Sequence, residues 1–248
     1  LGMDFVDVDL LICRREDCTL QEILDRRGLD AFLQVEEETV LETEFRDTVI
    51  ATGGSVPMSE KALIASIRLE MEMKRKNGAK YLLLTPGNYG ADFVKENTKL
   101  DVESSMKCSN YVGETLDMAV ELGFLGVLFV AHIGKFVKVS GGIMNTHSRH
   151  SDARAELMCA HALRSGADLE TAKAILETIT TEEAMEIIRM HGLQDAVMEQ
   201  MAEKVHQYMQ HRVEGAIQTE AILFSNRFGY LGETKGAEKL AEKFKYDL

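Results

Sequence analysis

Two short apolar segments, each ending abruptly in small and polar residues, constrain the fold of this chain most strongly. Residues 81–84 run into the loop 85–90, and residues 127–131 run into the loop 132–135. A helix-like stretch lies between them at residues 111–122 and stops at a glycine. This order of strand, helix and strand is typical of a βαβ unit in a buried parallel sheet.

The two loops are expected to form one binding site. In open α/β sheets a ligand binds beyond the carboxyl ends of the strands, and both loops begin there. Residues 85–90 read Thr-Pro-Gly-Asn-Tyr-Gly and offer close backbone approach, amide groups and an aromatic face. A plain tight turn is the alternative, and the residues leave both open.

The strand and helix patterns predict an α/β fold with two domains. A Rossmann-like parallel-sheet domain is expected over residues 49–248, carrying the strand-end loops. A smaller α/β domain is expected over residues 1–48, and we expect it to be incomplete here. Within it, residues 5–12 and 35–45 are predicted as strands, and residues 20–27 as a short helix stopped by a glycine.

Composition narrows the classes of function. The formal net charge of −13 argues against a nucleic-acid partner, which needs a basic face. No apolar run is long enough for a membrane span, and no signal-peptide pattern opens the chain, so a cytoplasmic location is predicted. The four cysteines lack CxxC spacing, which favours reduced thiols over disulfides or zinc. A homo-oligomer is left open.

A local basic region stands out in this acidic chain. Between residues 131 and 154 the formal charges are Lys135, Lys138, Arg149 and Arg154 against Asp152, a net +3. Chance clustering on a solvated loop and the binding of an anion are both compatible with this pattern.

Three histidines near the loops are candidates for chemistry. A histidine at a strand end, such as His132, can be a base, an acceptor or a buried hydrogen-bonded residue. His147 and His150 could share a metal, but no spacing demands a third ligand, so we predict no metal site. Cys108 precedes a helix, yet no base and orienting acid stand at triad-like positions, which disfavours covalent catalysis.

Several long motifs together resemble the cobalt-precorrin-5B (C1)-methyltransferases of anaerobic cobalamin biosynthesis, and their order and intervals fit that family. The resemblance is dense over residues 52–164 and thinner beyond. The motifs are Pro57-Met58-Ser59-Glu60, the segment 83–90, Lys107-Cys108-Ser109-Asn110, Gly113-Glu114, His132-Ile133-Gly134-Lys135 and the segment 142–149, Gly-Ile-Met-Asn-Thr-His-Ser-Arg.

The resemblance implies an enzyme that transfers a methyl group from S-adenosylmethionine to C1 of a cobalt-corrinoid substrate. The cofactor-binding residues it implies are Thr85, Pro86, Gly87, Asn88, Tyr89, Gly90, Ser109, Asn110 and Gly134. Those implied for the substrate are Lys135, Lys138, Asn145, Thr146, Ser148 and Arg149. His132 or His147 is the implied catalytic residue that takes up the released proton.

The sequence also departs from the family pattern. The Thr/Gly-rich N-terminal segment of the family, with its Thr-Gly-Thr-Cys-like motif and a Gly-rich loop, does not occur, and the acidic residue expected before Pro57 is missing. Two other interpretations therefore stay open. One is a non-methylating α/β module that binds a nucleotide or phosphorylated metabolite, and the other is a structural subunit with degenerate loops.

Overall fold

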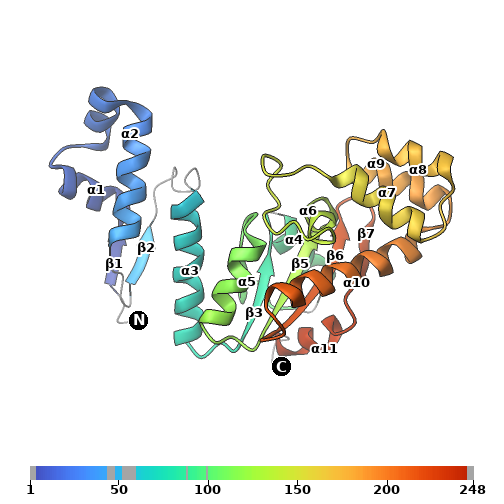
Figure 1. Cartoon of the computed structure of the whole chain (residues 1–248). Helices are drawn as coiled ribbons and strands as arrows, with labels where there is room; N and C mark the ends of the chain where they lie inside the picture. The colour runs from blue at the N-terminus through green and yellow to red at the C-terminus, as the bar shows by residue number, and fades with distance from the viewer. Residues whose placement is uncertain (1–3, 44–47, 52–59, 88, 99, 245–248) are drawn as a thin grey trace. The chain divides into compact units, whose positions relative to one another are not determined.

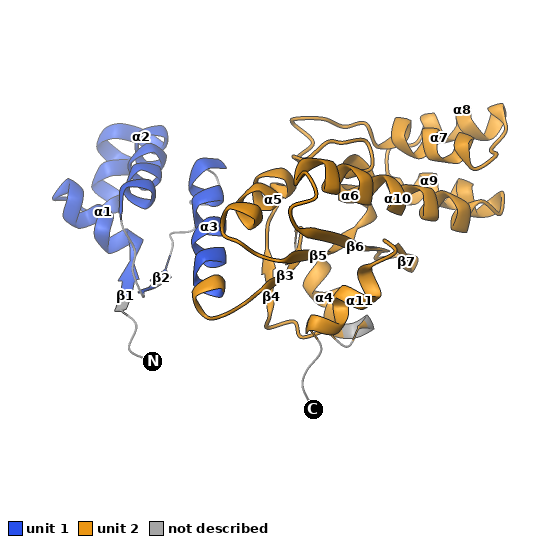
Figure 2. Ribbon diagram, turned by 60° about the horizontal axis from the view of Figure 1, so that its bottom comes forward, with its two compact units in different colours: residues 1–74 blue, residues 75–248 orange. Residues whose placement is uncertain are grey.

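A computed structural model describes residues 4–43, 48–51, 60–87, 89–98 and 100–244 (Figure 1). The chain divides into two compact units, Leu1–Lys74 and Arg75–Leu248 (Figure 2). Both combine helices with parallel strand pairing, which confirms the predicted α/β class. The sequence-based domain boundary between residues 48 and 49 stays a prediction.

The first unit is built on a pair of parallel strands. These are β1 (Asp4–Asp7) and β2 (Thr48–Ala51). Helices α1 (Val8–Glu16) and α2 (Leu20–Glu42) follow β1, and α3 (Glu60–Lys76) follows β2 and crosses the boundary between the units. Their apolar side chains form one core, which contains Val8, Ile12, Ile23, Phe32, Val35, Val40 and Ala62.

Two elements of this unit differ from their prediction, and a helix cap explains the first. The expected strand at 5–12 ends at Asp7, because the Asp7 carboxylate accepts from the Asp9 N–H at 2.9 Å and starts α1. The expected strand at 35–45 is wrong, since α2 continues to Glu42. The predicted stop at Gly28 is confirmed as a kink, with φ of +81° inside α2.

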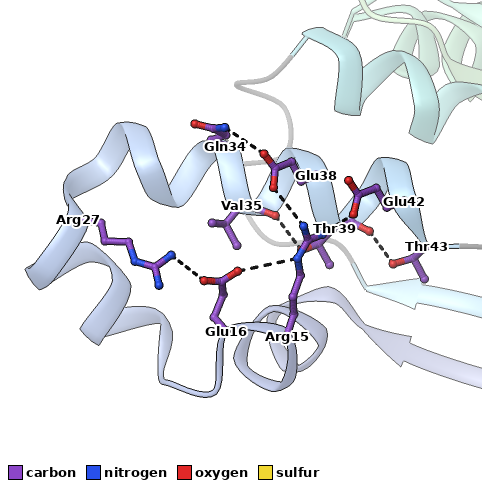
Figure 3. Close-up of polar contacts among 9 residues, drawn as sticks. All are labelled: Arg15, Glu16, Arg27, Gln34, Val35, Glu38, Thr39, Glu42 and Thr43. Carbon is purple, nitrogen blue, oxygen red and sulfur yellow. Dashed lines mark hydrogen bonds and ion pairs between the residues drawn. The ribbon is translucent and has the colours of Figure 1, made fainter.

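Ion pairs on the surface join α1 to α2 on both sides of its kink at Gly28 (Figure 3). The Arg15 guanidinium lies 3.1 Å from Glu38 Oε2 and 3.0 Å from Glu42 Oε2. Glu16 pairs with Arg27 at 2.6 Å, across the turn between the helices. Such exposed pairs contribute about 0–1 kcal/mol each, so the buried core carries most of the stability of this unit.

The second unit contains a five-stranded sheet in the order β4-β3-β5-β6-β7. Its neighbours are parallel except for β7, which runs antiparallel to β6 at the edge. The strands are β3 (Tyr81–Thr85), β4 (Ser105–Lys107), β5 (Gly126–His132), β6 (Gln218–Ser225) and β7 (Gly229–Glu233). The central strands are buried on both faces, as expected for a parallel sheet covered by helices.

Helices cover both faces of this sheet. Figure 2 shows α4 and α11 on one face and α5, α6 and α10 on the other. Four of these helices are α4 (Tyr89–Asn97), α5 (Val112–Glu121), α6 (Ile133–Val139) and α10 (Gln194–Arg212). The last is α11 (Ala237–Ala241), which a 3-10 turn (Glu242–Phe244) extends.

A helical excursion separates β5 from β6. Besides α6 and α10 it contains α7 (Arg154–Arg164), α8 (Leu169–Leu176) and α9 (Thr181–Met190). The predicted capping box of Thr180 and Glu183 starts α9. Within the described residues, no helix is both long and apolar enough to cross a membrane.

Candidate functional site

The predicted loops meet where the strand order of the sheet reverses. Strands β3 and β5 are neighbours, but the chain leaves β3 toward β4 on one side and leaves β5 toward β6 on the other. The helices begin inside the two predicted loops, α4 at Tyr89 and α6 at Ile133, and they lie on opposite faces of the sheet (Figure 2). Ligands of open α/β sheets bind beyond the strand ends at such a switch point.

Lys135 connects three of the loops at this edge. Its ammonium donates to the carbonyl oxygen of Ser109 at 3.4 Å and to the side-chain oxygen of Asn110. The same Asn110 oxygen accepts from the Thr146 hydroxyl at 3.1 Å. The predicted cofactor residues Ser109 and Asn110 are thus brought together with the predicted substrate residues Lys135 and Thr146.

The charge of Lys135 is balanced by none of these partners, because all of them are neutral oxygens. Burial lowers the pKa of the Lys135 ammonium, and the neighbouring charge of Lys138 lowers it further. A half-buried cation held by carbonyl oxygens at a strand end is suited to bind an anionic or polar ligand group.

The residues that follow β4 are held in a strained conformation. Ser109 has φ of +53°, which is the left-handed region that non-glycine residues rarely adopt. Such strain persists where the surroundings fix it, and it clusters at functional sites. The conformation turns the Ser109 carbonyl toward Lys135.

Two glycines of the loop after β3 are needed for close packing. Gly87 has φ of +85°, and a Cβ there would lie 3.0 Å from the Lys135 Cε. A Cβ on Gly90 would lie 2.7 Å from the Thr85 Cβ and 2.9 Å from the Val130 carbonyl oxygen. Gly90 therefore lets α4 start directly against the sheet. Asn88 lies outside the described residues.

The loop after α6 is fastened to the site by backbone contacts. The Thr146 N–H donates to the Asn110 carbonyl at 2.9 Å, and Asn145 forms an isolated bridge with Tyr111. Lys138 is buried and donates to the Thr146 carbonyl at 3.0 Å. Burial lowers the Lys138 pKa. Lys138 therefore anchors this loop through a buried hydrogen bond. Its role in binding substrate stays a prediction.

His132 caps the helix that follows it. Its Nδ1 accepts from the Gly134 N–H at 3.1 Å, and its Nε2 lies 3.4 Å from Glu182 Oε1. Burial lowers the His132 pKa, while the Glu182 carboxylate raises it. The exposed Tyr89 ring lies 6.0 Å from the imidazole, centroid to centroid.

His147 makes a similar local bond, with its Nδ1 accepting from the Arg149 N–H at 3.1 Å. Ser148 and Arg149 are exposed, on the part of the loop beyond the Lys135 contacts. The structure therefore joins His147 to the Arg149 backbone by a hydrogen bond. Neither residue is among the hydrogen-bond partners of Lys135. Their catalytic and substrate roles stay predictions.

Two other chemistries considered from the sequence were a nucleophilic Cys108 and a metal site. Cys108 is fully buried, and burial raises the pKa of its thiol to about 12, which does not suit a nucleophile. Among the described residues, no group of three or more His, Cys, Asp or Glu side chains could hold a metal ion. His147 and His150 are near each other, with ring centroids 6.4 Å apart.

Sequence reasoning missed two polar residues at this edge. Glu182 comes from the first turn of α9, and Ser225 ends β6. The Ser225 hydroxyl donates to Glu182 Oε1 at 3.3 Å, the oxygen that faces His132. The end of β6 could have been expected here, because β6 runs parallel to β5 and their carboxyl ends lie at the same edge. No local sequence pattern connects α9 with β5.

Family models match two separate parts of the chain. Residues 145–235 match the model described as CbiD, C-terminal domain. Residues 1–78 match the model described as shikimate kinase. The second match covers the segment before residue 52, where the N-terminal motifs of the methyltransferases are missing, and extends over the motif at residues 57–60.

Similar proteins carry one recurring name, cobalt-precorrin-5B C(1)-methyltransferase. The protein of Ruminiclostridium cellulolyticum is 42% identical over 180 residues, which are 72% of this chain and 47% of that protein. The protein of Alkaliphilus metalliredigens is 37% identical over 80% of this chain and 52% of its own length. The protein of Photorhabdus laumondii is 40% identical over 79% and 52%. The chain thus spans about half the length of these curated relatives. No solved structure matches it.

Proposed function

We propose that, over the segment that these relatives cover, the chain belongs to the cobalt-precorrin-5B C(1)-methyltransferase family and serves methyl transfer to C1 of a cobalt-corrinoid. S-adenosylmethionine is the proposed methyl donor. The observation that carries the proposal is the meeting of the loops after β3, β4 and β5 around Lys135, at the point where the strand order reverses.

The residues at this edge fit an S-adenosylmethionine cradle. Gly87 leaves its side-chain space to Lys135, and Gly90 allows α4 to begin against the sheet. Ser109 and Asn110 supply carbonyl and amide groups, and Tyr89 supplies an exposed ring. S-adenosylmethionine brings a methyl group that is already activated on a sulfonium sulfur.

The protein's task is then mainly alignment. Two reactants held in line at contact distance react far faster than free ones, by an effective concentration of about 10⁵–10⁸ M. We propose that the loop of residues 141–149 orients the corrinoid, with the exposed Arg149 guanidinium binding its carboxylates. His147 is the proposed proton acceptor. Its Nδ1 would become available when the hydrogen bond from the Arg149 N–H breaks.

The test is calorimetric titration with S-adenosylhomocysteine, compared with ATP and ADP. We expect S-adenosylhomocysteine to bind and to raise the melting temperature. Gly87→Val should abolish both effects, because a β-branched side chain fills the space against Lys135.

Gly123→Val is the matched control. Gly123 also has positive φ, +72°, but a Cβ there meets nothing within 4 Å. Binding that survives Gly87→Val would remove the loop after β3 from the site. Binding of ATP or ADP in place of S-adenosylhomocysteine would favour the non-methylating module.

The match to a shikimate kinase model favours a second candidate function for the first unit, nucleotide or phosphometabolite binding. Phosphoryl transfer needs backbone N–H groups and cations around the nucleotide phosphates. The P-loop pattern GxxxxGK[ST] does not occur in the 248 residues, and the Gly-rich segment 52–55 lies outside the described residues. ATP binding that persists in Gly87→Val would assign a nucleotide site outside the loop after β3.

A further inference from the structure

The two ring nitrogens of His132 have different partners. Nδ1 accepts a hydrogen bond from the Gly134 N–H at 3.1 Å, which caps α6. A nitrogen that accepts carries no proton, so the neutral imidazole has its proton on Nε2. His132 Nε2 is buried and lies 3.4 Å from Glu182 Oε1, an ion-pair distance, without forming a hydrogen bond to any described residue.

Glu182 is itself held in place from two sides. It lies in the first turn of α9, whose capping box fixes the start of the helix. Its Oε1 accepts from the Ser225 hydroxyl at 3.3 Å, and Ser225 Oγ accepts in turn from the Arg227 and Phe228 N–H groups. One carboxylate oxygen thus connects α9 with the carboxyl ends of β5 and β6.

The start of α9 also lies against the first turn of α6. A Cβ on Gly134 would be 3.4 Å from the hydroxyl of Thr181, the first residue of α9. Lys135 follows in the same turn and carries the contacts to Ser109 and Asn110. A shift of the His132 ring would therefore move the residue that joins the loops of the site.

We propose that Glu182 is a positioning residue: its carboxylate holds His132 in the Nε2–H form, and the turn 132–135 with Lys135 is fixed as a result. The proposal rests on the proposed function for its catalytic meaning. It assigns His132 to orientation of the site, because Nδ1 caps α6 and Nε2 lies beside the Glu182 carboxylate. Among the described residues, the titratable groups that face the ring are Glu182 and, through its phenol ring, Tyr89.

Glu182→Gln tests this role, since it removes the charge and keeps the shape of the side chain. In nitrogen-15 NMR spectra of the imidazoles, the native chain should show His132 as the Nε2–H tautomer. In the variant, the Nδ1–H tautomer should become detectable, and the His132 pKa should fall because the carboxylate that raises it is gone.

The control is Glu186→Gln, one turn further along α9, where the carboxylate pairs with Arg227 and not with His132. It should leave the His132 signals unchanged. If Glu182→Gln does not fold, Glu182→Asp retracts the carboxylate, keeps an acidic first turn, and should give an intermediate His132 pKa. A His132 pKa and tautomer identical to those of the native chain in the Glu182 variants would overturn the proposal.

A kinetic measurement connects this role with methyl transfer. Misplacement of reacting groups by ~1 Å costs about 10²-fold, so kcat should fall roughly 10–100-fold in Glu182→Gln while S-adenosylhomocysteine affinity changes little. The NMR readout needs no ligand. A changed tautomer in the variant, with no methyl transfer by the native chain, would therefore refute the proposed function alone. Unchanged NMR signals with normal activity would refute the positioning role alone.

Discussion

Replacing His161 should make the second unit markedly less sensitive to acid. His161 lies on α7 and is 1% exposed. The Ser140 hydroxyl donates to the Val137 carbonyl at 2.6 Å, so its oxygen accepts from His161 Nε2 at 2.8 Å. Nδ1 is buried and has no hydrogen-bond partner among the described residues.

The expected magnitude follows from the cost of charging this ring. Burial, helped by the charges of Arg164 and Lys204, lowers the pKa of His161 from 6.5 to about 4. Because the folded pKa is lowered, the stabilising contribution is complete above pH 6.5 and is lost as the pH falls toward the folded value. At ~1.4 kcal/mol per pH unit, the loss amounts to about 3 kcal/mol.

The assay is urea unfolding followed by circular dichroism at about pH 7 and about pH 4.5. Carboxylates also titrate in this range, so the informative quantity is the difference between variants. His161→Gln should lose less unfolding free energy on acidification than the native chain, by up to about 3 kcal/mol. His191→Gln, at an exposed histidine that ends α9, is the control and should behave like the native chain. Equal losses in His161→Gln and the native chain would refute the reasoning.

Three further results are expected. Gly90→Ala should lower the unfolding free energy by about 1–3 kcal/mol, because its methyl group overlaps Thr85, and no loss in urea unfolding would contradict the packing. In native protein at about pH 8, a thiol reagent should leave Cys108, whose pKa is about 12, unmodified while labelling half-exposed Cys13, as mass spectrometry can check. Arg149→Ala should weaken corrinoid binding by about 1.5–3 kcal/mol and leave S-adenosylhomocysteine binding unchanged, and equal weakening in calorimetry would exclude a substrate role.

The strand-end loops could be predicted because their signals are local. The apolar runs before Thr85 and His132 are too short for helices, and each ends in residues that stop a strand. Parallel pairing then brings the two ends to one edge whatever the remaining chain does. The family resemblance rested on these loops together with motifs at residues 57–60, 107–110, 113–114 and 142–149, and the relatives confirm the resemblance.

The N-terminal elements were harder to predict, because local side-chain bonds decided them. The alternating pattern at residues 5–12 suggested a strand throughout, but the Asp7 carboxylate caps a helix halfway along it. The acidic segment after Val35 has only weak alternation, and its buried residues Glu36, Thr39 and Val40 lie at helical spacing.

Contacts between distant segments left no trace in the sequence. Glu182 meets His132 only because the helical excursion folds back to the end of β5. The left-handed conformation of Ser109 likewise depends on its neighbours and not on its residue type. The hydrogen bond from Lys138 to the Thr146 carbonyl joins α6 to the loop after it, and no sequence pattern indicated it.

The helical excursion between β5 and β6 also sets the order in which the second unit can fold. Gly126 pairs with Gln218, so closing this parallel pair requires residues 133–217 to condense first or to form a very large loop. Contacts of such high sequence separation slow folding, whereas the β6–β7 hairpin and the helix pairs of the excursion form locally. During synthesis the loops after β3 and β5 emerge long before Ser225, and we expect the His132, Glu182 and Ser225 cluster to assemble in the last, slowest phase of refolding.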